Sequence, residues 1–285
     1  MSKSKPKMAN KSMQATGRGS GALTRQTNWP APDFWRYLIK KMKNFKDRDD
    51  LSRFLVHLTR DYEGDSAYRN LLNILSEKTI EARNAHCLVM HNLKSMRFSQ
   101  VLKRRFNTVC FTETPLTQIK KLISVGDRKI ELQPWGIIFW KDDLFESGAS
   151  PAIYINAKGT SVDKFLLDEF AAIFENITTL SKLKETEVQH YHNIVHYYSL
   201  INVVKESHDF MWEREWRHHG DFKFKYEDIV AIIAKNPDRF ENLCEKKLPQ
   251  KAFEKINKLP IISTDWGYEE LVEKLTIKIW NKLTK

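Results

Sequence analysis

Short apolar runs and amphipathic segments alternate along this chain, and the pattern predicts strands and helices in about equal measure. Runs typical of buried strands lie at 54–60, 108–112, 136–140, 152–155 and 229–234. A further return to β structure is predicted at 221–226, and a Gly-containing turn is predicted between the strands 136–140 and 152–155. Apolar residues at helical spacing predict helices at 33–43, at 67–78, from Pro115 onward and at 266–283.

The pattern changes to a helical period from 162 to about 208. Phe165, Phe170 and Phe174 belong to one apolar stripe, and Ile194 and Ile201 belong to another. This predicts a long helical insertion, about residues 161–210, between two strand-rich halves. The expected fold class is therefore α+β, with one domain covering residues 29–285.

Residues 1–28 are rich in Lys, Ser, Gly and Gln and contain few large apolar side chains. Such a composition does not offset the entropy of ordering, so this segment is expected to be a disordered basic arm. Six positive charges precede the first acidic residue, Asp33, and removing them from the net charge of +11 leaves +5. The arm fits either a nucleic-acid partner or a solvated tail.

Three cysteines stand far apart, and no apolar run approaches the roughly 20 residues that a membrane helix needs. The N-terminus shows no apolar segment of the secretory type. We therefore expect a cytoplasmic protein with no membrane partner.

The chain lacks the glycine-rich phosphate-binding motifs and the G-x-S-x-G and H-E-x-x-H motifs. His192 and His196 are spaced i, i+4, which places both rings on one helical face, and His190 lies nearby. No Glu follows His192 and no third ligand is marked. The pattern favours polar or interface histidines, and no metal site is predicted.

The segment from Trp212 to Arg217 carries the densest chemistry. If it is a strand, Glu213 and Glu215 point to one face and Arg214 to the other. Trp212 and Trp216 would then be buried against the core and hold the strand. An edge strand with solvated charges is the alternative interpretation.

Several segments in their order along the chain resemble a known family. These are "VHLTR", a Leu-rich helix, "VCFTETPLTQI", "WGIIFWKDDLFESGASPAIYI" and "EREWR". Together they resemble the AbiGi family of putative abortive phage-resistance proteins over residues 54–234, apart from the helical insertion. The arrangement is also similar to the ADP-ribosyltransferase fold, including DarT-type enzymes that modify nucleic acid.

The resemblance implies an ADP-ribosyltransferase-like split mixed/antiparallel β-sheet core with flanking helices, and it implies NAD as cofactor. It makes Glu215 the catalytic acid and Glu213 its assistant, because a fixed carboxylate stabilises an oxocarbenium-like centre. Cofactor-binding positions carried over from the family motifs are His57, Thr59, Arg60, Phe111, Thr112 and Glu113. Arg214 and Arg217 are further candidates for the pyrophosphate. The sequence departs from the Arg-bearing transferases in having His57 in the first strand.

Three functions stay open at this point. The first is an NAD-dependent ADP-ribosyltransferase in phage defence, with nucleic acid as acceptor, in which His57, Glu213 and Glu215 converge in one cleft. The second is a non-enzymatic antitoxin, a nucleic-acid- or protein-binding module on the same scaffold, with a partner protein encoded nearby. The third is a nuclease in which Glu113, Glu213 and Glu215 bind Mg²⁺.

Overall fold

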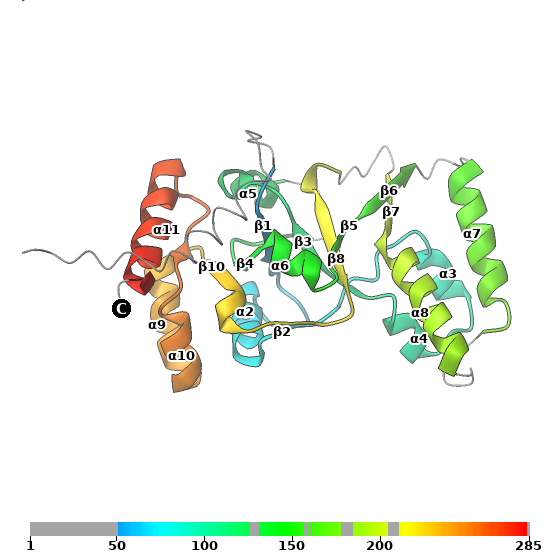
Figure 1. Cartoon of the computed structure of the whole chain (residues 1–285), viewed down its shortest axis with the longest axis horizontal. Helices are drawn as coiled ribbons and strands as arrows, with labels where there is room; N and C mark the ends of the chain where they lie inside the picture. The colour runs from blue at the N-terminus through cyan, green and yellow to red at the C-terminus, as the bar shows by residue number, and fades with distance from the viewer. Residues whose placement is uncertain are drawn as a thin grey trace, which may run out of the picture.

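The structure is a computed structural model that describes residues 51–125, 131–156, 159, 161–177, 185–204 and 211–283. The expected basic arm at 1–28 and the predicted helix at 33–43 lie outside these residues. Figure 1 shows a central sheet between a group of C-terminal helices and a separate helical group.

A seven-stranded mixed sheet forms the centre of the described chain. Its strand order is β11 (Ile261–Ile262), β10 (Ile229–Ile233), β4 (Gly136–Trp140), β1 (Phe54–Leu58), β3 (Thr108–Thr112), β8 (Glu215–His219) and β5 (Ser150–Pro151). The pairings are antiparallel except between β10 and β11. A mixed α/β fold is therefore confirmed, and the predicted strands 108–112 and 136–140 have the bounds of β3 and β4.

Gly136 allows β4 to approach β1 closely. It pairs with Leu58 in the register, and a Cβ atom at this position would collide with the carbonyl oxygen of His57. A glycine at the start of β4 thus removes a steric barrier between the two central strands.

One face of the sheet packs against α2 (Ala67–Glu77), α9 (Pro237–Lys247) and α10 (Gln250–Ile256). Leu71 and Leu75 of α2 and Phe240 of α9 join Phe111 and Phe139 of the sheet in one buried cluster. The apolar residues whose spacing predicted a helix at 67–78 form the face of α2 that is buried in this cluster.

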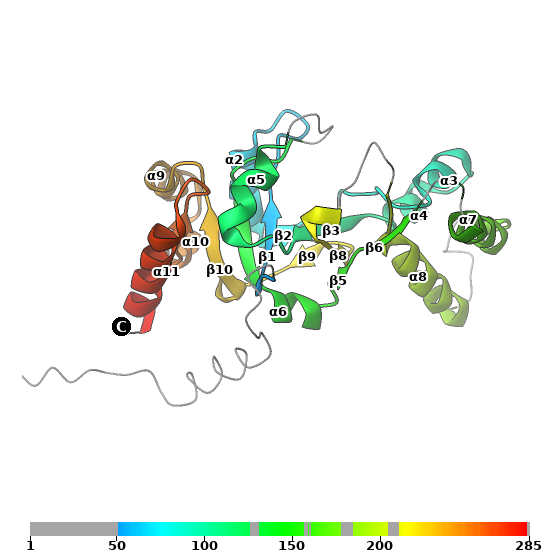
Figure 2. The same cartoon turned by 90° about the horizontal axis from the view of Figure 1, so that it is seen from above.

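The other face packs against α5 (Ile119–Ile123) and α11 (Tyr268–Leu283), which Figure 2 shows beside the sheet. Val56, Ile138 and Ile233 point to this face, and Ile119 and Leu271 cover them. Two helical layers therefore enclose β1, β4 and β10, and the sequences of β4 and β10 are continuous apolar runs.

A third core belongs to a helical unit, defined here as α3 (Met90–Ser95), α4 (Gln100–Arg104), α7 (Ser161–Phe174) and α8 (Glu185–Leu200) with β6 (Ile153–Asn156) and β7 (Ile201–Val204). Its centre is a group of edge-to-face aromatic contacts among Phe98, Phe106, Phe170 and Phe174. The predicted insertion at about 161–210 contains the helices α7 and α8, but residues 201–204 form a strand. The helix stops at Leu200, β7 pairs with β6 in parallel, and α3 and α4 join from an earlier part of the chain.

Other elements differ from the sequence-based expectations. The predicted turn after β4 contains α6 (Lys141–Glu146) and β5. The predicted strand at 221–226 is short, because only β9 (Phe222–Lys223) pairs, with β2 (Thr79–Ile80), before the 3-10 turn η4 (Tyr226–Asp228). The helix expected from Pro115 begins as a 3-10 turn, η1 (Leu116–Gln118), and the pattern missed α9, α10 and β11.

Candidate functional site

The two segments that carry the resemblance are paired side by side in the sheet. β3 and β8 run antiparallel with Thr112 opposite Glu215. Beyond the strand ends, the Glu113 N–H donates to the Arg214 carbonyl at 3.1 Å, and the Thr112 hydroxyl donates to the Glu213 carbonyl. The "CFTET" and "EREWR" motifs are therefore one structural feature.

A buried ion pair between Glu215 and Arg217 lies at the centre of this feature. Both residues are on one face of β8, and Trp216 is on the other. The Arg217 Nε and Nη2 atoms donate to the two carboxylate oxygens of Glu215 at 3.1 and 3.0 Å. The Arg217 side chain is 1% exposed and that of Glu215 is 12% exposed. The third nitrogen, Nη1, donates to the Ser199 carbonyl at the end of α8 at 2.7 Å.

The helical unit supplies the remaining partners of Glu215. The Asn202 amide of β7 and the Tyr154 hydroxyl of β6 donate to Glu215 Oε2 at 3.2 and 3.4 Å. The carboxylate thus accepts four hydrogen bonds, one at Oε1 and three at Oε2. Burial raises the pKa of the Glu215 carboxyl, but the Arg217 charge and these hydrogen bonds outweigh burial and leave the pKa below its ordinary value.

We call Tyr154, Ser199, Asn202, Glu215 and Arg217 the junction network, because it joins β8 to the helical unit. Burial and the nearby negative charge of Glu215 raise the pKa of Tyr154, so its hydroxyl stays a donor at neutral pH. Sequence analysis assigned no role to Tyr154, although this residue lies in one of the segments of the resemblance, and it missed Ser199 and Asn202, which no motif marks. It named Arg217 as a pyrophosphate ligand, whereas the structure commits this guanidinium to Glu215 and Ser199.

Glu113 has a different environment from Glu215. Its Oε1 accepts from Lys141 Nζ and its Oε2 from Trp216 Nε1, both at 2.8 Å. Trp216 lies on the face of β8 opposite Glu215, and the two carboxylates are bound by different partners. The structure therefore does not gather Glu113 and Glu215 around one position, as the nuclease hypothesis requires.

Glu213 lies outside the strand. It ends the 3-10 turn η3 (Met211–Glu213), and Arg214 adopts a left-handed backbone conformation with φ +48° before β8 begins. The prediction that Glu213 and Glu215 share one face of one strand is therefore wrong. The predicted burial of the two tryptophans is confirmed for Trp216, which is 8% exposed, and is wrong for Trp212, which is 44% exposed.

His57 is on the opposite face of the sheet from Glu215. Directly paired residues point to the same face of a sheet. Val56 pairs with Thr112, and Thr112 pairs with Glu215, so these three side chains share one face. His57 follows Val56 in the strand and therefore points to the other face. The His57 Nδ1 atom lies 2.9 Å from the Cys110 carbonyl oxygen, and burial lowers the ring's pKa to about 4. The expected convergence of His57, Glu213 and Glu215 in one cleft is not found.

Three more of the predicted cofactor-binding residues serve local structure. The Thr59 hydroxyl donates to the Ala67 carbonyl at 2.8 Å, where α2 begins. The Arg60 guanidinium lies 5.7 Å from the centre of the Tyr62 ring. Phe111 is 2% exposed and belongs to the main core cluster.

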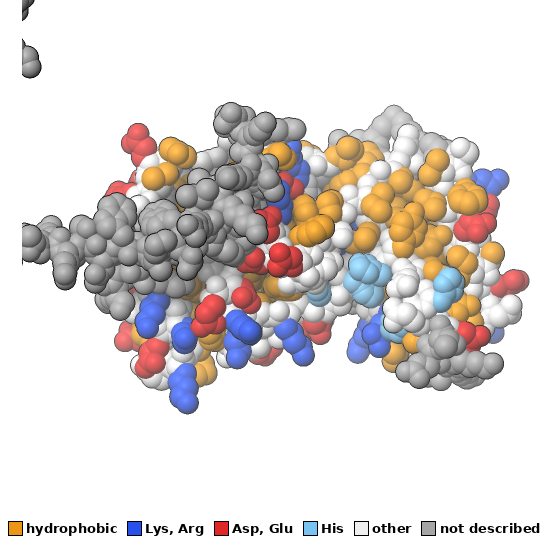
Figure 3. All heavy atoms as spheres, viewed as in Figure 1, with side chains coloured by type: hydrophobic (Ala, Val, Ile, Leu, Met, Phe, Trp, Pro, Cys, Tyr) orange, Lys and Arg blue, Asp and Glu red, His pale blue; other side chains and the backbone are white. Residues whose placement is uncertain are grey.

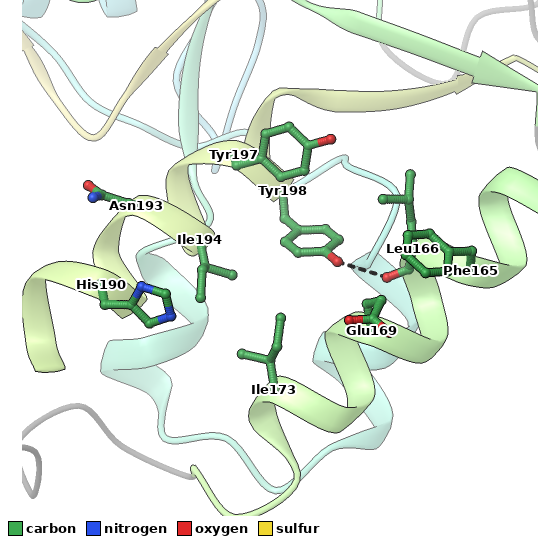
Figure 4. Close-up of a pocket in the computed structure, with 9 residues that line it drawn as sticks. All are labelled: Phe165, Leu166, Glu169, Ile173, His190, Asn193, Ile194, Tyr197 and Tyr198. Atoms are coloured by element: carbon green, nitrogen blue, oxygen red, sulfur yellow. Dashed lines mark hydrogen bonds between the residues drawn. The ribbon is translucent and has the colours of Figure 1, made fainter.

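An open hollow of about 400 Å³ lies between α7 and α8, and its lining is mostly apolar (Figure 4). The Tyr198 hydroxyl donates to the Leu166 carbonyl across its floor at 2.9 Å. Phe165 and Tyr197 at its rim are 60% and 48% exposed. Figure 3 shows apolar side chains gathered over this part of the molecule. The lining residues are Phe165, Leu166, Glu169, Ile173, His190, Asn193, Ile194, Tyr197 and Tyr198.

Comparison with protein-family models, with curated proteins and with solved structures finds no match to this chain. Within the described residues, no group of three or more His, Cys, Asp or Glu side chains is placed to hold a metal ion. No helix in the same residues has the length and apolar character needed to cross a membrane. The family resemblance thus rests on the order and spacing of the motifs alone.

Proposed function

We propose that this protein acts in phage defence as a non-enzymatic partner of a protein encoded nearby, and that it binds this partner through the hollow between α7 and α8. The observation that carries the proposal is the exposure of Phe165 and Tyr197 at the rim of an apolar hollow. Soluble proteins seldom leave contiguous apolar patches open, and aromatic side chains are enriched in the cores of protein interfaces.

The shape and charge of the hollow indicate what kind of surface it accepts. It lies between two helices, an arrangement suited to an amphipathic helix that inserts aliphatic side chains. Glu169 is the acidic residue of its lining, so a Lys or Arg on the partner would meet it. The partner is therefore expected to present an apolar helix face with a basic residue beside it.

The environment of the motif residues supports a structural role for them. The Glu215 carboxylate accepts four hydrogen bonds, Lys141 and Trp216 donate to Glu113, and His57 lies on the opposite face of the sheet. A catalytic carboxylate needs an open position for its substrate, whereas this one joins β8 to the helical unit.

Co-expression with the products of the flanking genes tests the proposal. Phe165→Asp places a charge at the rim of the hollow. Phe145→Asp is a matched control, because Phe145 is 63% exposed on α6, outside the hollow. Wild type and Phe145→Asp are expected to co-purify with one flanking product in a stoichiometric complex, and Phe165→Asp is expected to lose it. No complex with either product, or equal binding by both variants, would contradict the proposal.

An NAD-dependent ADP-ribosyltransferase acting on nucleic acid is the second candidate. It is favoured by the direct pairing of β3 with β8, which brings Thr112 beside an ionised Glu215. An ionised, oriented carboxylate can stabilise an oxocarbenium-like centre. In this candidate Glu215 would exchange the Tyr154 and Asn202 hydrogen bonds for a ribose hydroxyl of NAD.

Incubation with labelled NAD and cell nucleic acid tests the second candidate. The transferase would label nucleic acid, would lose this activity in Glu215→Gln, and would keep it in Glu146→Gln, which alters an exposed carboxylate on α6. Absence of label from the wild type, or equal labelling by both variants, removes this candidate.

A further inference from the structure

Histidine side chains gather where the helical unit meets β8, and Figure 3 shows histidines beside this unit. The rings of His196 on α8 and His219 on β8 are in contact, with centroids 4.9 Å apart and planes inclined by 40°. His192 precedes His196 by one helical turn. His192, His218 and Arg105 lie near His219.

Two ring nitrogens in this contact have no hydrogen-bond partner. They are Nε2 of His196 and Nδ1 of His219, and both atoms are buried. Across the described residues, Ser66 Oγ is the one other buried side-chain polar atom of this kind. A buried polar atom without a partner costs about 1–3 kcal/mol, so two in adjacent rings require an explanation.

A metal ion shared by the two rings would give both nitrogens a partner. A tetrahedral zinc ion binds imidazole nitrogen at about 2.0–2.1 Å, so the centroids of two rings on one ion lie about 5 Å apart. The observed separation is 4.9 Å. Burial lowers the pKa of both rings, that of His219 to about 4. Neutral imidazole is the form that binds metal ions.

We propose that His196 and His219 form a two-histidine site for a divalent transition-metal ion, with water in the remaining coordination positions. Because one ligand comes from α8 and the other from β8, the ion would fasten the helical unit to the sheet next to the junction network. The proposal is independent of the function proposed above, since neither ring lines the hollow between α7 and α8.

Calorimetric titration of the untagged full chain with Zn²⁺, Ni²⁺ and Cu²⁺ tests the site. We expect saturable binding of one ion per chain, tightest for Cu²⁺, and a higher Tm in the presence of the ion. His196→Asn and His219→Asn are each expected to weaken binding at least tenfold. His91→Asn, which alters an exposed histidine on α3, is the matched control and should bind like the wild type.

The His192→Asn variant separates this site from a simpler one. If the ion sat on the i, i+4 pair of α8 alone, His192→Asn would lose binding and His219→Asn would keep it, which would overturn the proposal. Absence of saturable binding of all three ions at millimolar concentration would also overturn it. X-ray absorption of the zinc-loaded wild type gives a readout that does not depend on variant folding. The proposal expects two imidazole ligands, and none or one would contradict it.

Discussion

Replacing Glu215 with alanine leaves the Arg217 guanidinium buried without its charge partner. Arg217 is 1% exposed, and its Nε and Nη2 atoms lose the acceptors at 3.1 and 3.0 Å, while Nη1 keeps the Ser199 carbonyl. Removing one partner of a buried ion pair costs about 3–5 kcal/mol. We expect the free energy of unfolding to fall by about this amount.

A double variant identifies the cause of the loss. With Glu215→Leu and Arg217→Met, no charge is left unpaired, and apolar side chains replace the buried pair. Such replacements are neutral or stabilising by about 1–4 kcal/mol in other proteins, so the double variant is expected to recover most of the stability. Urea denaturation gives both values, with Glu146→Ala expected to stay within about 0.5 kcal/mol of the wild type. A loss below about 1 kcal/mol for Glu215→Ala, or a double variant no more stable than the single, would refute this reasoning.

Three further predictions follow from buried groups. The pKa of His57 is about 4 in the folded chain, below the ordinary histidine value of 6.5, so the unfolded state takes up the proton first as the pH falls. The free energy of unfolding should therefore decline from pH 6.5 toward pH 4. Urea titrations should show a shallower decline with pH for His57→Gln than for the wild type, and an equal decline in the two proteins would contradict this prediction. Gly136→Ala should cost about 1–3 kcal/mol, because the added methyl group meets the His57 carbonyl, and an unchanged Tm would contradict this. Burial raises the pKa of Cys87 to about 11 and of Cys244 to about 12, and it also raises that of Cys110, so a thiol reagent should label these three residues only on unfolding.

The sequence predicts best where a strand is buried on both faces. The bounds of β4 follow from an uninterrupted apolar run, which helices on both sides of the sheet favour, and those of β3 follow from a short apolar centre between two threonines. The helices α7 and α8 follow from their stripes, because each buries one face in the helical unit. In these elements the local pattern and the packing agree.

The pattern fails where a single residue changes the backbone or a distant partner decides the outcome. Arg214 takes a left-handed conformation that ends the expected alternation, and no residue type there signals it. Ile201 and Val204 fit helical spacing, yet pairing with β6 makes them a strand. Likewise, the role of Asn202 depends on the hydrogen bond that it donates to Glu215 on a different strand. The motifs therefore marked Glu215 and Arg217 but did not predict their contacts, and no motif marks the hollow between α7 and α8.

Amide hydrogen exchange, compared between the chain alone and its complex with the flanking gene product, tests the proposed binding function most directly. Binding in the hollow should slow exchange in α7 and α8, at residues 161–174 and 185–200, and leave β3 and β8 unchanged. Protection confined to β3 and β8, with α7 and α8 exchanging as in the chain alone, would contradict the account and return the functional centre to Glu215.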